Sequence, residues 1–269
     1  MLIVRRRVDL ELTGKVALVV AGSKGLGRGC ALALAREGAH VAICSRSEAH
    51  LAAAAADIRA ATGTDVLAMP ADVAREPDIR AVVAATTERF GGIDILVNNS
   101  GGPRIGSFAD LTDDDWQAAF ELLTLNFVRF VREVVPHMRA RRWGRIIGIQ
   151  STSVKQPVGN IDLSNGIRPG IAGLMKALMP DLATDGITIN LVLPGRFLTA
   201  RISPGLDESA PPDPDLQARL KPLAQTIPVG RLGEPIELGG LVAFLASERA
   251  GYITGAVYQI DGGITASNI

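Results

Sequence analysis

A cluster of glycines near the beginning of the chain has the composition of a phosphate-binding turn. The stretch is Val20-Ala21-Gly22-Ser23-Lys24-Gly25-Leu26-Gly27, and it stands between an apolar run and a segment that we expect to be helical. A glycine-rich turn between a strand and a helix exposes backbone N–H groups and the positive end of the helix to a pyrophosphate. We therefore predict that this turn binds a dinucleotide. A tight turn without a ligand is the alternative.

The end of the second apolar run bears on which dinucleotide would bind. That run ends Ile43-Cys44-Ser45-Arg46, without an acidic residue. An NAD site has a carboxylate here for the ribose hydroxyls, whereas an arginine accommodates the 2′-phosphate of NADP. Arg46 can form a charge-assisted fork with phosphate, Ser45 can donate a hydrogen bond, and Lys24 adds a second cation. The sequence favours NADP(H) over NAD(H), unless Arg46 is only a solvated residue at the start of a helix.

The elements that must position these residues alternate between short apolar runs and longer amphipathic ones. The expected strands cover residues 16–20, 41–45, 66–68, 95–98, 145–149, 188–193 and 257–260. The expected helices cover residues 25–37, 47–61, 75–90, 112–141, 165–184 and 235–247. This alternation is typical of βαβ units around a parallel sheet. We predict a single α/β domain over 1–269, Rossmann-type and doubly wound, with a seven-stranded parallel sheet flanked by helices on both faces.

Residues 196–228 interrupt the alternation. Between Arg201 and Pro228 this segment contains six prolines. Because proline disrupts both helix and sheet, we expect an irregular excursion here. The segment follows the sixth strand, beyond the carboxyl end, where open α/β sheets bind ligands. It is interpreted as a substrate lid, with a plain surface loop as the alternative.

Composition excludes several classes of protein. The chain has 28 Lys and Arg and 28 Asp and Glu, so it lacks the excess positive charge that nucleic-acid binding requires. Its two cysteines, Cys30 and Cys44, are interpreted as small core residues; they indicate neither a disulfide framework nor a metal site, and they suit a reducing cytoplasm. The apolar stretch before Arg5-Arg6-Arg7 is too short for a signal peptide or a membrane span. We therefore expect a soluble, cytoplasmic protein.

The order and spacing of several short motifs between residues 12 and 263 resemble the short-chain dehydrogenase/reductase family. The glycine turn is similar to the family's Thr-Gly-x-x-x-Gly-x-Gly fingerprint: Gly25 and Gly27 match the last two glycines, and Ala21 replaces the first. We expect Gly22 to supply the backbone freedom that Ala21 lacks. Further matches, in chain order, are Asp72-Val73, Asn98-Asn99-Ser100-Gly101, Asn126, Pro194-Gly195 with Thr199, Ile253-Thr254-Gly255 and Asp261-Gly262-Gly263.

This resemblance implies roles for the matching residues. Asp72 and Val73 would contact adenine, Asn98 to Gly101 would border the cofactor, and Pro194, Gly195 and Thr199 would close over the nicotinamide. It also implies a 3-oxoacyl-carrier-protein reductase-like enzyme with a small-molecule substrate, assembled as a homotetramer or dimer.

The catalytic residues depart from the family pattern. Ser151 matches the serine that polarises the substrate carbonyl, and Asn126 matches the helix asparagine. The family's tyrosine and lysine, however, fall on Ser164 and Arg168. The run Gly170-Ile171-Ala172-Gly173-Leu174 resembles the family sequence that follows the lysine and fixes this register. The resemblance therefore implies a divergent member that lacks the tyrosine–lysine pair.

The replacements alter the chemistry that these positions can perform. A hydroxyl such as Ser164 is a weaker acid than a phenol, and a guanidinium such as Arg168 cannot relay a proton but can bind a ribose or an anionic substrate. Pro169 disfavours helical backbone at Arg168, so we expect a kinked helix or one that begins near Pro169 with Asn165 or a neighbour as its cap. Lys155 is the candidate replacement acid if it is desolvated in the cleft, and a surface lysine is the alternative.

The sequence thus predicts an NADP(H)-dependent oxidoreductase with an atypical catalytic site, acting on a carbonyl or imine and its reduced counterpart. Two other functions stay open. The first is a dinucleotide-binding sensor or partner subunit without turnover. The second is a lyase or isomerase on the same fold, which would avoid protonating an alkoxide.

Overall fold

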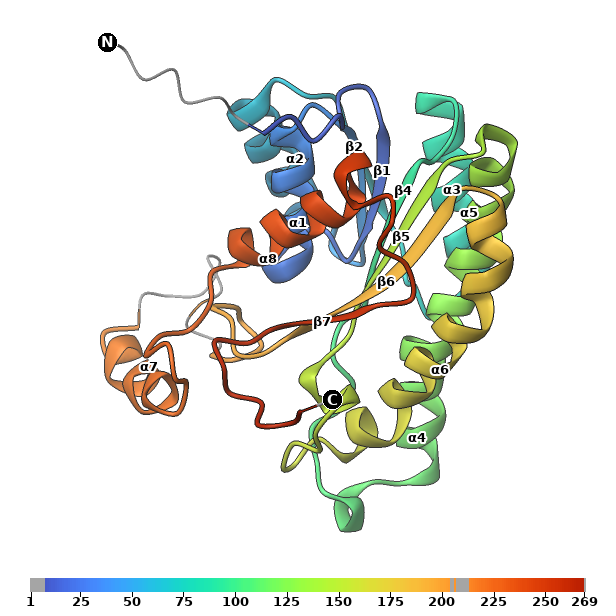
Figure 1. Ribbon diagram of the computed structural model, residues 1–269. Coiled ribbons are helices and arrows are strands. Elements are labelled where there is room, and N and C mark those ends of the chain that lie inside the picture. The colour runs from blue at the N-terminus through green and yellow to red at the C-terminus, as the bar shows by residue number, and fades with distance from the viewer. Residues whose placement is uncertain (1–7, 204–205, 207–212, 269) are drawn as a thin grey trace.

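The strands of the computed structural model, which describes residues 8–203, 206 and 213–268, form a parallel sheet in the order β3-β2-β1-β4-β5-β6-β7 (Figure 1). They are β1 (Val16–Val20), β2 (His40–Ser45), β3 (Val66–Pro70), β4 (Ile95–Asn99), β5 (Gly144–Ile149), β6 (Ile187–Pro194) and β7 (Val257–Ile260). The direction of winding reverses between β1 and β4, which is where such sheets open a crevice for ligands. The predicted seven-stranded, doubly wound sheet is confirmed.

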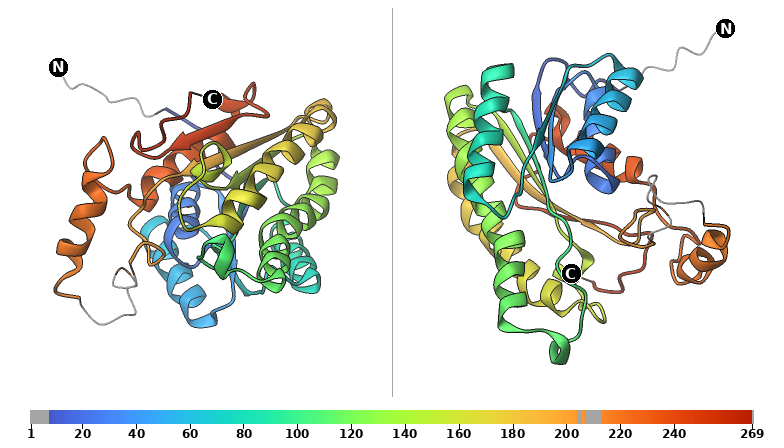
Figure 2. Two further views of the ribbon diagram at one scale, coloured as in Figure 1. Left: turned by 90° about the horizontal axis from the view of Figure 1, so that it is seen from below. Right: turned by 180° about the vertical axis from the view of Figure 1, so that it is seen from behind.

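Both faces of the sheet are covered by helices, which explains why the strands are almost continuously apolar. One face carries α1 (Gly25–Arg36), α2 (Glu48–Thr62) and α8 (Pro235–Ala246), and the other carries α3 (Glu76–Phe90), α5 (Asn126–Arg141) and α6 (Asp162–Thr184) (Figure 2). Within β1, Val19 belongs to the first apolar cluster and Leu18 to the second, and both are fully buried. The sheet is therefore held between two cores, and its carboxyl edge is left to the loops.

Helices α1 and α8 cross at a pair of glycines. A Cβ atom on Gly239 would lie 2.4 Å from the carbonyl oxygen of Gly29, and one on Gly29 would lie 2.4 Å from that of Pro235. Neither position has room for a larger side chain. This close crossing fixes the beginning of α8 against the helix that follows the glycine turn.

The long helical stretch expected over 112–141 has three parts. The first is α4 (Asp113–Phe120), whose N-cap Thr112 forms a capping box with Asp115. A π-helical segment, η2 (Glu121–Leu125), follows and leads into α5. The helical prediction is confirmed, but a single uninterrupted α-helix is not. Such π segments often occur at functional sites, and this one ends where the buried Asn126 begins α5.

The prediction that a helix starts near Pro169 is wrong. Helix α6 begins at Asp162 and continues through Pro169. Asn165 is not its cap; it lies in the first turn, and its side chain bonds the backbone N–H and C=O of Val158 at 3.0 and 2.8 Å. Burial of apolar residues on both sides of the proline, such as Leu163 and Ile171, offsets the penalty of about 3 kcal/mol for an interior proline. A kink at Pro169 stays a prediction.

The proline-rich segment is not irregular throughout, because α7 (Leu216–Gln225) includes Pro222. Helix α7 lies well away from the sheet in Figure 1. A small separate apolar cluster, built on Leu220, Ile227 and Leu232, holds it in place. Pro204, Pro211 and Pro212 fall outside the described residues. Short 3₁₀ turns complete the chain: η1 (Phe108–Asp110), η3 (Thr152–Val154) and η5 (Glu248–Ala250). Within the described part of the chain, the helices are too short or too polar to cross a bilayer.

Candidate active site at the carboxyl edge of the sheet

The glycine turn follows β1 directly and leads into α1. A Cβ atom on Gly27 would lie only 2.2 Å from the carbonyl oxygen of Ala21, so this position requires glycine. Ala21 itself adopts a left-handed conformation with φ +51°. The expectation that Gly22 supplies this freedom is therefore wrong. Gly22 supplies space instead, because a Cβ there would lie 2.7 Å from the Cγ2 atom of Ile43 on β2.

The end of β2 presents two polar groups with unused hydrogen-bonding capacity. The Ser45 hydroxyl is buried and has no hydrogen-bond partner among the described residues. Arg46 follows it and is exposed. A buried hydroxyl without a hydrogen-bond partner destabilises the folded protein unless a bound ligand supplies that partner. The backbone N–H of Ala71 donates to the Ser45 carbonyl at 2.8 Å, so Asp72 and Val73 lie beside the same strand end. This donor set fits a phosphorylated ribose.

The end of β4 lies against the glycine turn. A Cβ on Gly27 would come within 3.0 Å of the Asn99 side-chain nitrogen. Asn98 donates from Nδ2 to Oδ1 of Asn126 at 2.7 Å, and both side chains are buried. The Nδ2 atom of Asn126 has no partner among the described residues. The structure thus joins the turn, the end of β4 and the start of α5; Ser100 and Gly101 follow in the loop.

Two further predicted residues arrive from the end of β6. The Gly195 N–H donates to the Ile260 carbonyl of β7 at 3.0 Å, which sets the direction of the chain after Pro194. Thr199 then lies over the glycine turn, because a Cβ on Gly25 would be 3.2 Å from its Cγ2 atom. The beginning of the 196–228 segment therefore contacts the candidate phosphate site.

The catalytic candidates lie at the end of β5 and on α6. Ser151 follows β5, and its hydroxyl accepts a hydrogen bond from the Ser153 N–H at 3.1 Å. Ser164 and Arg168 are both buried and stand one turn apart on α6. Arg168 donates from Nη1 to Oε1 of Gln150 at 2.9 Å and from Nε to the Ser164 hydroxyl at 3.4 Å. Its guanidinium is therefore fixed at the end of β5.

Arg168 is a buried cation whose side-chain partners in the described structure are both neutral. Only 5% of the residue is exposed. Burial, together with the positive charge of Arg201, lowers the pKa of the Arg168 guanidinium to about 10. The side chain remains protonated at neutral pH. It can consequently stabilise a negative charge, but it cannot accept a proton as a base there.

Lys155 points toward the last strand of the sheet. It is half-buried, and its Nζ atom donates to Oε1 of Gln259 on β7 at 3.2 Å. No described contact joins it to Ser151 or Ser164. Lys155 as the replacement acid stays a hypothesis.

Sequence reasoning missed two residues of this site. Gln150 precedes Ser151 and holds Arg168; a polar residue at the end of an apolar strand was the signal for it. Arg201 comes from the segment after β6, donates to the Pro103 carbonyl at 2.9 Å, and lies directly over Gly102. No local sequence pattern predicts that Arg201 lies at this site, because its position depends on the path of a loop.

A cavity of about 570 Å³ opens beside the glycine turn, between α1, α2 and α8. Its wall includes Ser23, Lys24, Gly25 and Thr199. The volume lies within the range of small-molecule sites. Ser151, Ser164 and Arg168 do not line it, so the cavity adjoins the candidate phosphate site rather than the catalytic candidates.

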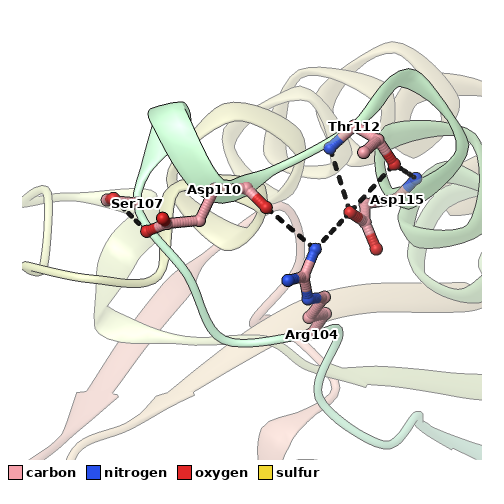
Figure 3. A network of polar contacts seen from close by, with 5 residues as sticks. All are labelled: Arg104, Ser107, Asp110, Thr112 and Asp115. Atoms are coloured by element: carbon pink, nitrogen blue, oxygen red, sulfur yellow. Dashed lines mark hydrogen bonds and ion pairs between the residues drawn. The ribbon is translucent and has the colours of Figure 1, made fainter.

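The loop after β4 is braced by a network of polar contacts (Figure 3). Arg104 donates to Asp115 at 2.5 Å and to the carbonyl of Asp110 at 2.9 Å. Asp115 also accepts from the backbone N–H of Thr112, and Ser107 donates to the Asp110 carboxylate. The hydrogen bonds that Asp115 accepts, first from the Thr112 backbone and then from the Thr112 and Arg104 side chains, hold the pKa of Asp115 below its usual range. Arg104 is therefore neutralised by a carboxylate.

The two cysteines are buried, as expected of core residues. Burial raises the pKa of the Cys44 thiol to about 12 and raises that of Cys30 further. Neither thiol ionises near neutral pH, which agrees with their interpretation as small core side chains.

Known proteins resemble this chain over almost its whole length. The profile of a family described as enoyl-(acyl carrier protein) reductase matches residues 20–265. The oxidoreductase UcpA of Escherichia coli K12 is 35% identical over 256 residues, covering 95% of this chain and 96% of UcpA. The 3-oxoacyl-[acyl-carrier-protein] reductase FabG of Vibrio cholerae is 35% identical, covering 95% and 99%. Among solved structures, L-sorbose reductase of Gluconobacter frateurii in complex with NADPH and L-sorbose superposes with a TM-score of 0.89 at 33% identity, covering 97% of this chain and all of that one.

Proposed function

This chain belongs to the short-chain dehydrogenase/reductase family, and on that premise we propose that it is an NADP(H)-dependent oxidoreductase acting on a carbonyl or imine and its reduced counterpart. The glycine turn of β1, with Ser45 and Arg46 at the neighbouring strand end, is the observation that carries the proposal. The relatives support it, since one is a reductase whose structure was solved with NADPH.

The cofactor would be held by residues whose polar groups are still available. The turn from Ala21 to Gly27 would receive the pyrophosphate on its backbone N–H groups. Arg46 would bind the 2′-phosphate together with the Ser45 hydroxyl, for which the described residues offer no partner. Asn98, bonded to Asn126, and Thr199, which lies over Gly25, would border the nicotinamide end.

When bound, the reduced dinucleotide would supply the hydride for the carbon of the substrate C=O or C=N bond. The Ser151 hydroxyl then donates a hydrogen bond to the reacting heteroatom, which receives the electron pair of the broken π bond. The charge of Arg168 stabilises that developing anion, an effect typically worth about 100-fold or more in rate. The proton that completes the product comes from water or from Lys155, the two proton sources that we propose.

Residues 196–228 would border the substrate. Two contacts support this assignment, namely Thr199 against Gly25 and Arg201 against Gly102. Together they bring the beginning of the segment to the glycine turn and to the loop after β4. Substrate bound at the end of β5 would therefore meet Arg201.

The cofactor assignment is tested by calorimetric titration with NADPH and NADH. We expect Arg46→Ala to weaken NADPH binding by about 10- to 100-fold, because it removes a charge-assisted hydrogen bond, and to leave NADH binding within threefold. Arg36→Ala, an exposed arginine at the far end of α1, is the matched control and should change neither affinity. No affinity of the folded wild-type protein for NADPH would remove the proposal.

One observation favours the second candidate, a dinucleotide-binding protein without turnover. The Ser151 hydroxyl is bonded to the Ser153 N–H, and no contact in the described part of the chain brings an ammonium group or a second hydroxyl to it. NADPH consumption with a panel of ketones and imines separates the two functions. Turnover that falls in Ser151→Ala supports the oxidoreductase. Binding of NADPH with no consumption by any substrate, and no effect of Ser151→Ala or Lys155→Ala, supports the sensor or partner subunit.

A further inference from the structure

Two arginines from different segments bring positive charge to the same edge of the site. Arg168 stands on α6 at the end of β5, and Arg201 follows β6. They are close enough for the charge of Arg201 to depress the pKa of Arg168. Burial also lowers the pKa of Arg201 itself. The geometry agrees, because Arg168 is bonded to Gln150 just after β5, Arg201 is bonded to Pro103 just after β4, and these two strands are neighbours in the sheet.

Neither cation has an acidic partner in the described structure. The contacts of Arg168 are Gln150 and Ser164, and the contact of Arg201 is the Pro103 carbonyl, so every acceptor is neutral. Other arginines of this chain are paired with carboxylates, as Arg104 is with Asp115 at 2.5 Å. Charges held together without a counter-ion are unfavourable, most of all when one of them is buried. Among the residues that the structure describes, no acidic side chain is bonded to either cation of this cluster.

We propose that Arg168 and Arg201 bind the carboxylate of the substrate, so that the enzyme acts on oxo acids. This inference rests on the proposed function. A carboxylate is planar and accepts two parallel hydrogen bonds from a guanidinium, which is why arginine suits it. The carboxylate would offset one of the two positive charges, and the other would remain to act on the anion that develops during reduction. The diphosphate of the dinucleotide is the other anion available, but the backbone of the glycine turn already offers it a site.

Binding can be measured without turnover. The full-length protein is loaded with NADP⁺, which cannot reduce a ketone, and titrated by calorimetry with matched pairs of acid and methyl ester. The pairs are acetoacetate, levulinate, 2-oxooctanoate and phenylpyruvate, each with its ester. We expect at least one acid to bind the wild-type protein about 10-fold or more tightly than its ester, as for a charged hydrogen bond.

Two variants localise the effect. Arg201→Gln should weaken binding of the acid by about 10- to 100-fold and leave the affinity for its ester within threefold of the wild-type value. Arg104→Gln is the matched control, because it changes the net charge by the same amount at a residue next to Pro103. The charge of Arg104 is already neutralised by Asp115, so this substitution should leave the affinities for the acid and for its ester unchanged. Thermal unfolding controls for folding; Arg201→Gln should unfold at the same temperature as wild type or higher, because it removes a like-charge repulsion.

Three results would overturn the inference: no acid preferred over its ester, equal losses in Arg104→Gln and Arg201→Gln, or a tenfold loss of NADPH affinity in Arg201→Gln. The last would assign the cation to the dinucleotide. Failure of the proposed function is distinct from these. Acids that bind the folded protein through Arg201, without NADPH consumption in any reduction assay, would retain the anion site and exclude the reductase.

Discussion

The glycine turn after β1 and the polar cluster at the end of β5 are built in different ways. The turn is made by backbone, since Gly27 has no room for a Cβ and Ala21 takes a positive φ within one short segment. The cluster is made by side chains from separate segments, because Gln150 after β5 meets Ser164 and Arg168 of α6, and Arg201 approaches from a third segment. The geometry of a site made of backbone depends on the spacing of a few residues along one segment. A site made of side chains can change its chemistry while the fold around it stays the same.

The strongest test of this contrast is Gly27→Ala. The new methyl group would meet the Ala21 carbonyl at 2.2 Å, so the backbone of the turn must move. We expect an affinity for NADPH about 100-fold lower and an unfolding free energy lower by about 3 kcal/mol. Calorimetry and chemical denaturation measure both. Gly173→Ala, a helical glycine with open space around it, is the control and should stabilise by about 0.5–1 kcal/mol. Equal effects at the two glycines would contradict a turn limited by space.

Arg168→Met tests the other half of the comparison. Removing a buried guanidinium without an acidic partner should raise the unfolding free energy by about 1–2 kcal/mol at pH 7, while kcat falls by about 100-fold. The folded-state pKa of Arg168 is lowered from 12.5 to about 10, so the unfolded chain binds that proton more tightly. The buried Arg168 charge therefore lowers the unfolding free energy of the wild-type protein by its full amount below pH 10. This destabilisation disappears as the pH rises from 10 toward 12.5.

The stability gap between Arg168→Met and wild type should accordingly narrow above pH 10. Denaturation of both proteins at pH 7 and at pH 10.5 measures it. A variant less stable than wild type at pH 7 would show that the hydrogen bonds to Gln150 and Ser164 outweigh the desolvation of the charge.

Ala21→Gly is a smaller change in the backbone site. Alanine at φ +51° is strained, and glycine removes that strain at the expense of a more flexible unfolded chain. We expect a net gain of about 0.5–1 kcal/mol in unfolding free energy. Ala53→Gly, in the middle of α2, should lose about the same amount, so the two substitutions should have opposite signs. Loss of stability in Ala21→Gly would contradict a left-handed residue at this position.

The smallest effect concerns Glu237, which is paired with Arg231 by two hydrogen bonds of 2.7 Å at the surface. The hydrogen bond from Arg231, then that from the Glu234 backbone, lowers the pKa of Glu237 to about 2. The ionised Glu237 carboxylate therefore stabilises the folded protein above pH 4.5, and this contribution is lost as the pH falls toward 2. Because the pair is exposed, Glu237→Gln should lower the unfolding free energy by only about 0.5 kcal/mol at pH 7, and by nothing at pH 2. Denaturation at the two pH values measures this.

The sequence predicted the sheet, both helical layers and the glycine turn because each depends on a local pattern. It failed at Pro169, where burial of Leu163 and Ile171 outweighs the preference of one residue, and over 216–225, where a helix includes Pro222. The candidates Ser151, Ser164 and Arg168 came from the resemblance to a family motif, and the structure brings Ser164 and Arg168 into contact. Arg201 could not be predicted, because its place beside Gly102 is set by a tertiary path that no periodicity encodes.

The two ends of the proline-rich segment both contact helix α1, at positions about one helical turn apart. Thr199 rests on Gly25 as the segment departs, and Pro235 rests on Gly29 as the chain returns. What lies between is a closed loop with its own small apolar cluster. Loop-closure entropy grows only slowly with length. We therefore expect that shortening or extending the chain between these two contacts costs little stability and leaves the glycine turn after β1 in place.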